Sequence, residues 1–299
     1  MKFSSTTVAV AAALGVAAHP GGLAHKNLHR QVEKRTDFFM NTRPLAEPPV
    51  PNPPPPPPPP ATTSVAKPTP TNPSGSAGKK KPEFCSGPSK RASAASIAYK
   101  GNVGTSGNYG CNMMAVDDTD GFNHTLALYN NSDEDMKCTL WNKIGPTGGI
   151  NGFFKGNQAL EVDLPARGKK NVAFQPDTQG GAACGKGEVP YNNIGLTTGL
   201  WVEYDYGSAP NGDWNGADAS GLTAADSGQK PGTSLIVYRV DNGTVPDVVD
   251  VNDIIGRGYP YSLINADGSG TNAYTKGTND LDGVGIKGPG TFHIRAVYS

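Results

Sequence analysis

An alternation of apolar and polar residues with a period of two sets the fold class of this chain. The run ALEVDL places Leu160, Val162 and Leu164 on one face of a strand and the two acids between them on the other. Comparable runs lie at 125–129, 138–143, 171–175, 200–206, 234–240, 245–251 and 291–298. Loops rich in Gly, Pro and Asn separate them. This pattern predicts an all-β, antiparallel β-sandwich, with one short helix near 223–228.

Eight consecutive prolines, Pro53–Pro60, divide the chain into two parts. Proline fixes φ and lacks a backbone N–H, so residues 36–82 are predicted to be a disordered, proline-rich linker. The β-sandwich domain is expected at 83–299, which is long enough for one core. Residues 1–82 carry ten Lys/Arg and three Asp/Glu, whereas 83–299 carry sixteen and twenty-three. An acidic folded domain argues against nucleic acid and anionic membranes as partners.

The N-terminus resembles a secretory leader. Met1 and Lys2 precede an apolar run at 8–18 that is too short to span a membrane and ends in small residues before His19. Residues 1–18 are therefore predicted to be a signal peptide. The pair Lys34–Arg35 suggests dibasic processing, which makes 19–35 a candidate pro-peptide. We expect a protein that is secreted, extracellular or in the cell wall, without a membrane anchor.

Cysteines and glycosylation motifs agree with that destination. An even number of cysteines after a secretory leader predicts two disulfides, and three pairings remain open. The four cysteines are Cys85, Cys111, Cys138 and Cys184. Three Asn-X-Ser/Thr motifs predict glycosylated, exposed turns at Asn123, Asn130 and Asn242.

The stretch 198–222 has the strongest functional signal, because it combines tryptophans with acids. Strand periodicity places Trp201, Glu203 and Asp205 on one face, whereas 213–222 is expected to be a loop. An exposed Trp beside acids suits sugar binding, and acids about 6.6 Å apart along a strand suit an inverting glycosidase. A half-buried strand with a polar face is the third interpretation. The candidate carbohydrate-binding residues are Trp201, Glu203, Asp205, Asp213, Trp214 and Asp218.

Other chemistry has little support in the sequence. The domain has two histidines, His124 and His293, and lacks a G-x-S-x-G motif, so a Ser/His/Asp or zinc site is poorly supported. Acids at 117–120 and 280–282 do not fit the spacing of an EF-hand calcium loop. We therefore predict no metal and no cofactor.

Five motifs resemble the secreted fungal allergen family of the Asp f four type. They are YKGNVG at 99–104, LWNKIGPTGGINGFF at 140–154, NVAFQPDTQGGAACGKGEVP at 171–190, WVEYDYG at 201–207 and DWNGADASGL at 213–222. The resemblance covers 99–222 well and implies an extracellular fungal protein with host IgE as a partner. It implies no enzymatic activity.

A weaker likeness concerns the thaumatin-like β-sandwiches. The segments LALYNN, TLW, GNQALEVDLPARG and DASGL follow the order of that family. This likeness implies a sandwich with a β-glucan cleft lined by Glu203 and by Asp213 or Asp218.

Together these observations predict a secreted, non-catalytic cell-wall or surface protein of allergen type that binds β-glucan. The alternative is a glycoside hydrolase that acts on β-glucan through Glu203 and Asp205.

Overall fold

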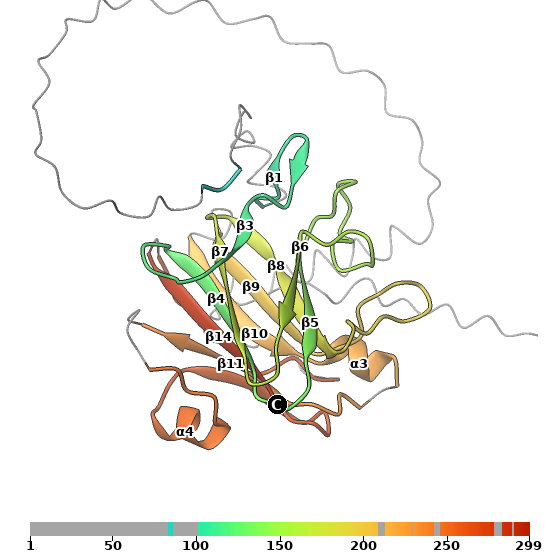
Figure 1. The fold of residues 1–299 in the computed structure, drawn as a ribbon, viewed down its shortest axis with the longest axis vertical. Helices are drawn as coiled ribbons and strands as arrows, with labels where there is room; N and C mark the ends of the chain where they lie inside the picture. Colours follow the sequence, from blue (N-terminus) through green and yellow to red (C-terminus); the bar gives the residue numbers. More distant parts are fainter. Residues whose placement is uncertain are drawn as a thin grey trace, which may run out of the picture.

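A computed structural model describes residues 83–85, 101–208, 213–228, 230–241, 246–277, 283–288 and 290–299. The predicted signal peptide, pro-peptide and linker, with Lys34, Arg35 and Asn242, lie outside the described residues. Strand is the main regular structure of the described chain, and it forms two main sheets and one hairpin (Figure 1). The predicted all-β class is therefore confirmed.

The first main sheet has five strands. In spatial order they are β10 (Trp214–Ser220), β9 (Trp201–Ser208), β8 (Thr178–Lys186), β5 (Met136–Asn142) and β6 (Leu160–Leu164). All four pairings in this sheet are antiparallel. Strand β9 lies between β8 and β10, so it is central and not at an edge.

The second main sheet has seven strands. In spatial order they are β13 (Gly270–Thr271), β12 (Tyr261–Ile264), β11 (Leu235–Val240), β14 (Phe292–Tyr298), β4 (His124–Asn130), β7 (Lys169–Phe174) and β3 (Met113–Val116). Its pairings are antiparallel except for β14 with β4, which is parallel. The small hairpin pairs β1 (Gly104–Thr105) with β2 (Asn108–Tyr109).

The inner faces of the two main sheets form one continuous core. Leu126 and Leu128 of β4 and Val202, Tyr204 and Tyr206 of β9 are fully buried members of the same hydrophobic cluster. This packing confirms the predicted sandwich. It also confirms which side of β9 faces inward, as the period of two predicted.

Both outer faces of the sandwich are also covered. The segment that contains α4 (Val251–Gly256) packs Val248 and Ile254 on the seven-stranded sheet. On the five-stranded sheet, Trp141 and Trp201 are covered by Phe153, Leu196 and Leu222, the first residue of α3 (Leu222–Asp226). Residues on both faces of the central strands are therefore removed from water.

Three local predictions need correction. The expected strand at 245–251 is wrong, because 246–250 has no regular structure and α4 begins at Val251. The expected loop at 213–222 is mostly strand β10, which pairs with β9 along its length. Strand β8 was not expected because its sequence, TQGGAACGK, lacks alternation.

The small residues of β8 have a packing reason. A Cβ atom on Gly181 would lie 2.7 Å from Cζ2 of Trp141, and one on Gly180 would overlap the carbonyl oxygen of Trp141. The glycines let neighbouring β5 place its tryptophan directly over β8. Sequence periodicity cannot detect such a strand, since its signal is the absence of side chains.

The four cysteines form the two predicted disulfides. Cys138 and Cys184 join directly paired positions of β5 and β8, and Cys85 joins Cys111 just after the β1–β2 hairpin. The second link attaches residues 83–85 to the domain. Among the described residues, no helix is long and apolar enough to cross a membrane.

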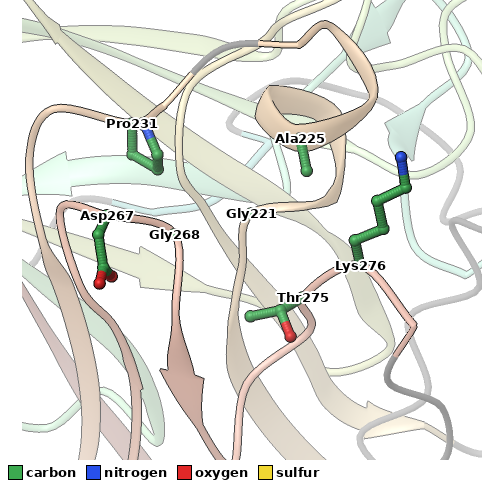
Figure 2. Close-up of a pocket in the computed structure, with 7 residues that line it drawn as sticks. All are labelled: Gly221, Ala225, Pro231, Asp267, Gly268, Thr275 and Lys276. Carbon is green, nitrogen blue, oxygen red and sulfur yellow. The ribbon is translucent and has the colours of Figure 1, made fainter.

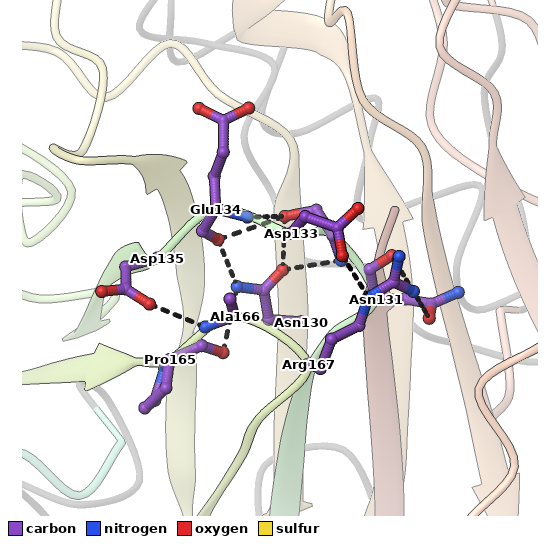
Figure 3. A network of polar contacts seen from close by, with 9 residues as sticks. Asn130, Asn131, Asp133, Glu134, Asp135, Pro165, Ala166 and Arg167 are labelled. Carbon is purple, nitrogen blue, oxygen red and sulfur yellow. Dashed lines mark hydrogen bonds and ion pairs between the residues drawn. The ribbon is translucent and has the colours of Figure 1, made fainter.

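Asn130, a predicted glycosylation site, instead holds two loops together (Figure 3). Its side-chain nitrogen donates to the carbonyl oxygens of Glu134 at 2.7 Å and Pro165 at 3.1 Å. Its side-chain oxygen accepts from the backbone and hydroxyl of Ser132. Asn130 is buried, so the prediction of an exposed turn is wrong there, whereas Asn123 is exposed.

This network generates a prediction about glycosylation. We expect glycan at Asn123 and none at Asn130, because the nitrogen that would carry the glycan is buried and already bonded. Enzymatic deglycosylation in heavy-oxygen water, followed by mass spectrometry, identifies the modified residue. We also expect Asn130→Ala to lower the free energy of unfolding by about 1–3 kcal/mol, and Asn123→Gln to leave it unchanged. Glycan on Asn130 of the folded protein contradicts this assignment.

Candidate functional site

The outer face of the five-stranded sheet gathers most of the acids that the sequence singled out. Glu203 of β9 is directly opposite Gly181 on β8 and Asp218 on β10. Two residues before Glu203, on the same face of β9, Trp201 is opposite Ala183 of β8 and Ser220 of β10. Pairing therefore brings Glu203 and Asp218 together, although fifteen positions separate them in the sequence.

Glu203 and Asp218 form a buried pair of like charge. Glu203 is 3% exposed and Asp218 is fully buried. Directly opposed residues have Cβ atoms about 4.5–5.5 Å apart, so two ionised carboxylates would repel strongly. Burial raises the pKa of Glu203 to about 7, against the opposing effects of Lys143 and a hydrogen bond with Ser220. Burial and the charge of Glu203 raise the pKa of Asp218 well above its usual range.

Asp205 and Lys143 complete the cluster. Asp205 lies two residues beyond Glu203 on the same face, and burial raises its pKa to about 7. Lys143 favours the ionised forms of both acids, while burial lowers the pKa of its own ammonium group. Sequence reasoning missed Lys143. The alternation of Thr139, Trp141 and Lys143 along and just beyond β5 was the signal that could have placed it on this face.

Trp201 is not the exposed platform that the sequence predicted. Its side chain is 2% exposed, and its ring packs edge-on against Trp141, with centroids 4.9 Å apart. Phe153, from the loop after β5, covers it at 5.4 Å. Loops and aromatic rings therefore enclose this part of the sheet, which periodicity alone could not reveal.

Unpartnered polar atoms concentrate on this same face. Five buried side-chain atoms of the sheet have no hydrogen-bond partner: Oγ1 of Thr139, Nε1 of Trp201, Oδ1 of Asp205 and both carboxylate oxygens of Asp218. The covering loop adds Oδ1 of Asn151. Buried polar groups are nearly always paired in folded proteins. This concentration points to a place where further donors and acceptors belong.

Asp213 and Trp214 do not join this cluster. Trp214 pairs with Ser208 at the far end of β9, and Asp213 before it is exposed with a φ of 60°. Trp214 is half-buried. The structure thus unites Trp201, Glu203, Asp205 and Asp218, and leaves the other two candidates at the end of the strand.

The two histidines of the described domain lie elsewhere. His124 is buried beside the ring of Tyr206, and Nδ1 of His293 lies 2.8 Å from the hydroxyl of Thr125. Both belong to the seven-stranded sheet. Within the described part of the chain, no group of three or more His, Cys, Asp or Glu residues could hold a metal ion.

A separate hollow of about 220 Å³ lies beside α3 (Figure 2). Its lining residues are Gly221, Ala225, Pro231, Asp267, Gly268, Thr275 and Lys276. The carboxylate of Asp267 already accepts hydrogen bonds from the backbone and hydroxyl of Ser269. The hollow therefore offers less unused hydrogen-bonding capacity than the acid cluster.

The buried acids make stability depend on pH in a defined direction. A carboxyl whose pKa is higher in the folded than in the unfolded state stabilises the fold below the unfolded pKa. That stability is lost as the pH rises from about 4.5, the ordinary pKa of Glu203, towards about 7, its pKa in the folded protein. We expect Glu203→Gln to raise the free energy of unfolding at pH 8 by about 3 kcal/mol, since each pKa unit corresponds to about 1.4 kcal/mol. Urea unfolding of both chains at pH 4 and pH 8 measures the difference.

Glu161→Gln is the matched control, because Glu161 is exposed on β6 of the same sheet. We expect this variant to follow the wild type at both pH values. Burial lowers the pKa of His124 to about 4, which destabilises the fold as pH falls, but this contribution is common to all three chains. A Glu203→Gln variant less stable than the wild type at pH 8 contradicts the account of the cluster.

Comparison with known proteins assigns the domain to a family. Residues 111–298 match the family model described as "Allergen Asp f 4-like domain". The chain is 34% identical over 151 residues to the Aspergillus fumigatus protein named "Allergen Asp f 4". This match covers 48% of the chain and 46% of the relative, so the chain spans about half the length of that protein.

Among solved structures, one similar chain is the protein elicitor MoHrip2 from Magnaporthe oryzae. The TM-score is 0.34 at 11% identity, over 57% of this chain and 97% of the other. The likeness to thaumatin-like proteins stays a prediction. The family match covers more than half of the sequence and nearly all of the sandwich. The chain therefore belongs to the Asp f 4-like allergen family.

Proposed function

We propose that this chain is a secreted surface protein that binds cell-wall polysaccharide, with β-glucan as the first candidate, on the outer face of its five-stranded sheet. The observation that supports this most is the set of unpartnered atoms on Thr139, Trp201, Asp205 and Asp218. A site for a polyhydroxylated ligand accounts for them better than structural packing does.

The mixture of atom types favours a sugar. Nε1 of Trp201 can only donate a hydrogen bond, whereas the free carboxyl oxygens of Asp205 and Asp218 accept hydrogen bonds when these groups are ionised. A sugar hydroxyl does both, so one chain of hydroxyls satisfies both kinds of atom. A metal ion would satisfy the carboxylates and leave the indole N–H without a partner. The two neighbouring tryptophan rings add apolar surface of the kind on which sugar rings stack.

A ligand reaches this face only if the cover moves. Residues 143–157, which contain Phe153 and Asn151, include five glycines. Glycine adopts many backbone conformations, so such a loop rearranges at lower energetic cost than a helix or strand. We propose that this loop opens to admit the sugar.

A non-catalytic role fits the electrostatics better than hydrolysis by Glu203 and Asp205. An inverting glycosidase needs one protonated and one ionised carboxyl, which the environment of each residue keeps apart in pKa. Burial instead raises the pKa of both groups to about 7.

The binding proposal predicts how variants behave with insoluble β-1,3-glucan. We expect the wild-type chain to bind in a pull-down, and Trp201→Phe with Asp218→Asn to weaken binding at least about tenfold, because both remove hydrogen bonds to the ligand. Phenylalanine keeps the aromatic packing but lacks the N–H, so the double variant tests recognition more cleanly than alanine would.

Trp214→Phe is the matched control, because Trp214 lies outside the cluster, and we expect it to bind as the wild type does. Reducing ends are counted in the same samples, and their release by the wild type but not by Glu203→Gln would establish the hydrolase alternative. Equal binding by wild type and double variant places the site elsewhere.

We also propose that the secreted protein binds IgE from sensitised hosts, by analogy with the relative named as an allergen. The two disulfides hold β5, β8 and the segment at 83–85 in place, so they preserve surface epitopes. We expect IgE in sera from people sensitised to fungi to bind the native chain and to bind the reduced, alkylated chain more weakly. An immunoassay with both forms measures this. Absence of IgE binding to the native chain contradicts the proposal.

A further inference from the structure

The acid cluster is short of positive charge. Three carboxyl groups, those of Glu203, Asp205 and Asp218, lie buried on one sheet face. Lys143 acts electrostatically on Glu203 and Asp205. When all three acids are ionised, one ammonium group faces three carboxylates.

Asp218 is the least compensated of the three. Within the described part of the chain, the charge that acts on it is that of Glu203, which is of the same sign. Both of its oxygens lack a hydrogen-bond partner, although the side chain is fully buried. Ionised buried carboxylates are normally paired with a cation. When Asp218 ionises, it therefore needs a counter-charge beside it, on the side shared with Glu203.

We propose that the ligand of this site carries a primary ammonium group, as a sugar of the glucosamine type does, and that this group binds between Asp218 and Glu203. The inference rests on the proposed glycan site and selects amine-bearing polysaccharide over neutral glucan as its ligand class.

The chemistry of an ammonium group matches the arrangement. It has three N–H donors, which suit the two oxygens of Asp218 and one of Glu203. Hydrogen bonds between charged partners are shorter and stronger than neutral ones, above all in a buried site. Trp201 and Trp141 lie beside Glu203 and Asp218 on the same sheet face. Their rings attract cations through their negative faces. The free indole N–H of Trp201 is left for a hydroxyl oxygen of the same sugar.

Binding of such a ligand releases protons. Burial and mutual repulsion keep Glu203 and Asp218 largely protonated below neutral pH. An ammonium group between them stabilises their ionised forms, so at least one proton leaves as the ligand enters. The other charged groups near Glu203 and Asp218 are Lys143 and Asp205, and the charge of Asp177 acts on Asp205. A neutral sugar has no comparable effect.

Calorimetry on the full secreted chain at about pH 6 tests this. The ligands are tetrasaccharides of glucosamine, N-acetylglucosamine and β-1,3-linked glucose. We expect the glucosamine oligomer to bind at least about tenfold more tightly than its acetylated counterpart, the size of one hydrogen bond between charged groups. Repeating the titration in buffers of different ionisation enthalpy should show release of about one proton for glucosamine and none for the other two.

Asp218→Asn should make the affinities for the glucosamine and N-acetylglucosamine oligomers about equal, because the amide cannot balance an ammonium charge. Asp163→Asn is the matched control, since Asp163 is an exposed acid on β6 of the same sheet, paired with Lys137. It should keep the preference, which separates specific binding from general attraction to an acidic surface. Circular dichroism checks that each variant folds. If Asp218→Asn does not fold, the proton release of the wild type still tests the proposal.

The outcomes distinguish the two proposals. Equal affinity for the three tetrasaccharides without proton release overturns the ammonium inference and leaves the glycan site intact. Binding of glucose or N-acetylglucosamine oligomers but not of glucosamine has the same meaning. If no tetrasaccharide binds, both proposals fail.

Discussion

The cross-strand pairing of Glu203 with Asp218 is the constraint around which the candidate site is organised. It exists because β9 lies between β8 and β10, with its tyrosines in the sandwich core and its acids on the covered outer face. Ionising both carboxyls in such surroundings costs much free energy, so the pair needs one retained proton or one added cation. The raised pKa values and the unpartnered oxygens follow from this placement, and Lys143 offsets part of the negative charge.

The cluster also bears on stability. Buried carboxyls without full partners lower the free energy of unfolding, and apolar residues would pack this face more favourably. The remainder of the fold compensates through the continuous core of the two sheets and the disulfide between β5 and β8. The groups that lower the stability of the fold are those that a ligand can satisfy. That relation connects the unpartnered groups of this face to its proposed function.

Much of the fold was readable from the sequence, since the runs at 125–129, 159–164 and 200–206 gave strands β4, β6 and β9, the last two with the correct faces. Strand β8 was not readable, because its glycines make room for Trp141 and leave no alternation. The burial of Trp201 was not readable either, because Phe153 covers it from a loop far away in the sequence, together with Leu196 from the segment just before β9. The pairing of Glu203 with Asp218 depends on strand register, which local patterns do not contain.

The most direct test observes the side chain at the centre of the account. In an NMR spectrum of the labelled protein, the indole N–H groups of Trp141, Trp201 and Trp214 give separate signals, which Trp201→Phe and Trp214→Phe assign. During titration with a glucosamine tetrasaccharide, we predict a saturable downfield shift of the Trp201 signal, because its free N–H gains an acceptor. The signal of half-buried Trp214 should stay in place. A Trp214 signal that shifts while that of Trp201 remains fixed would contradict the account.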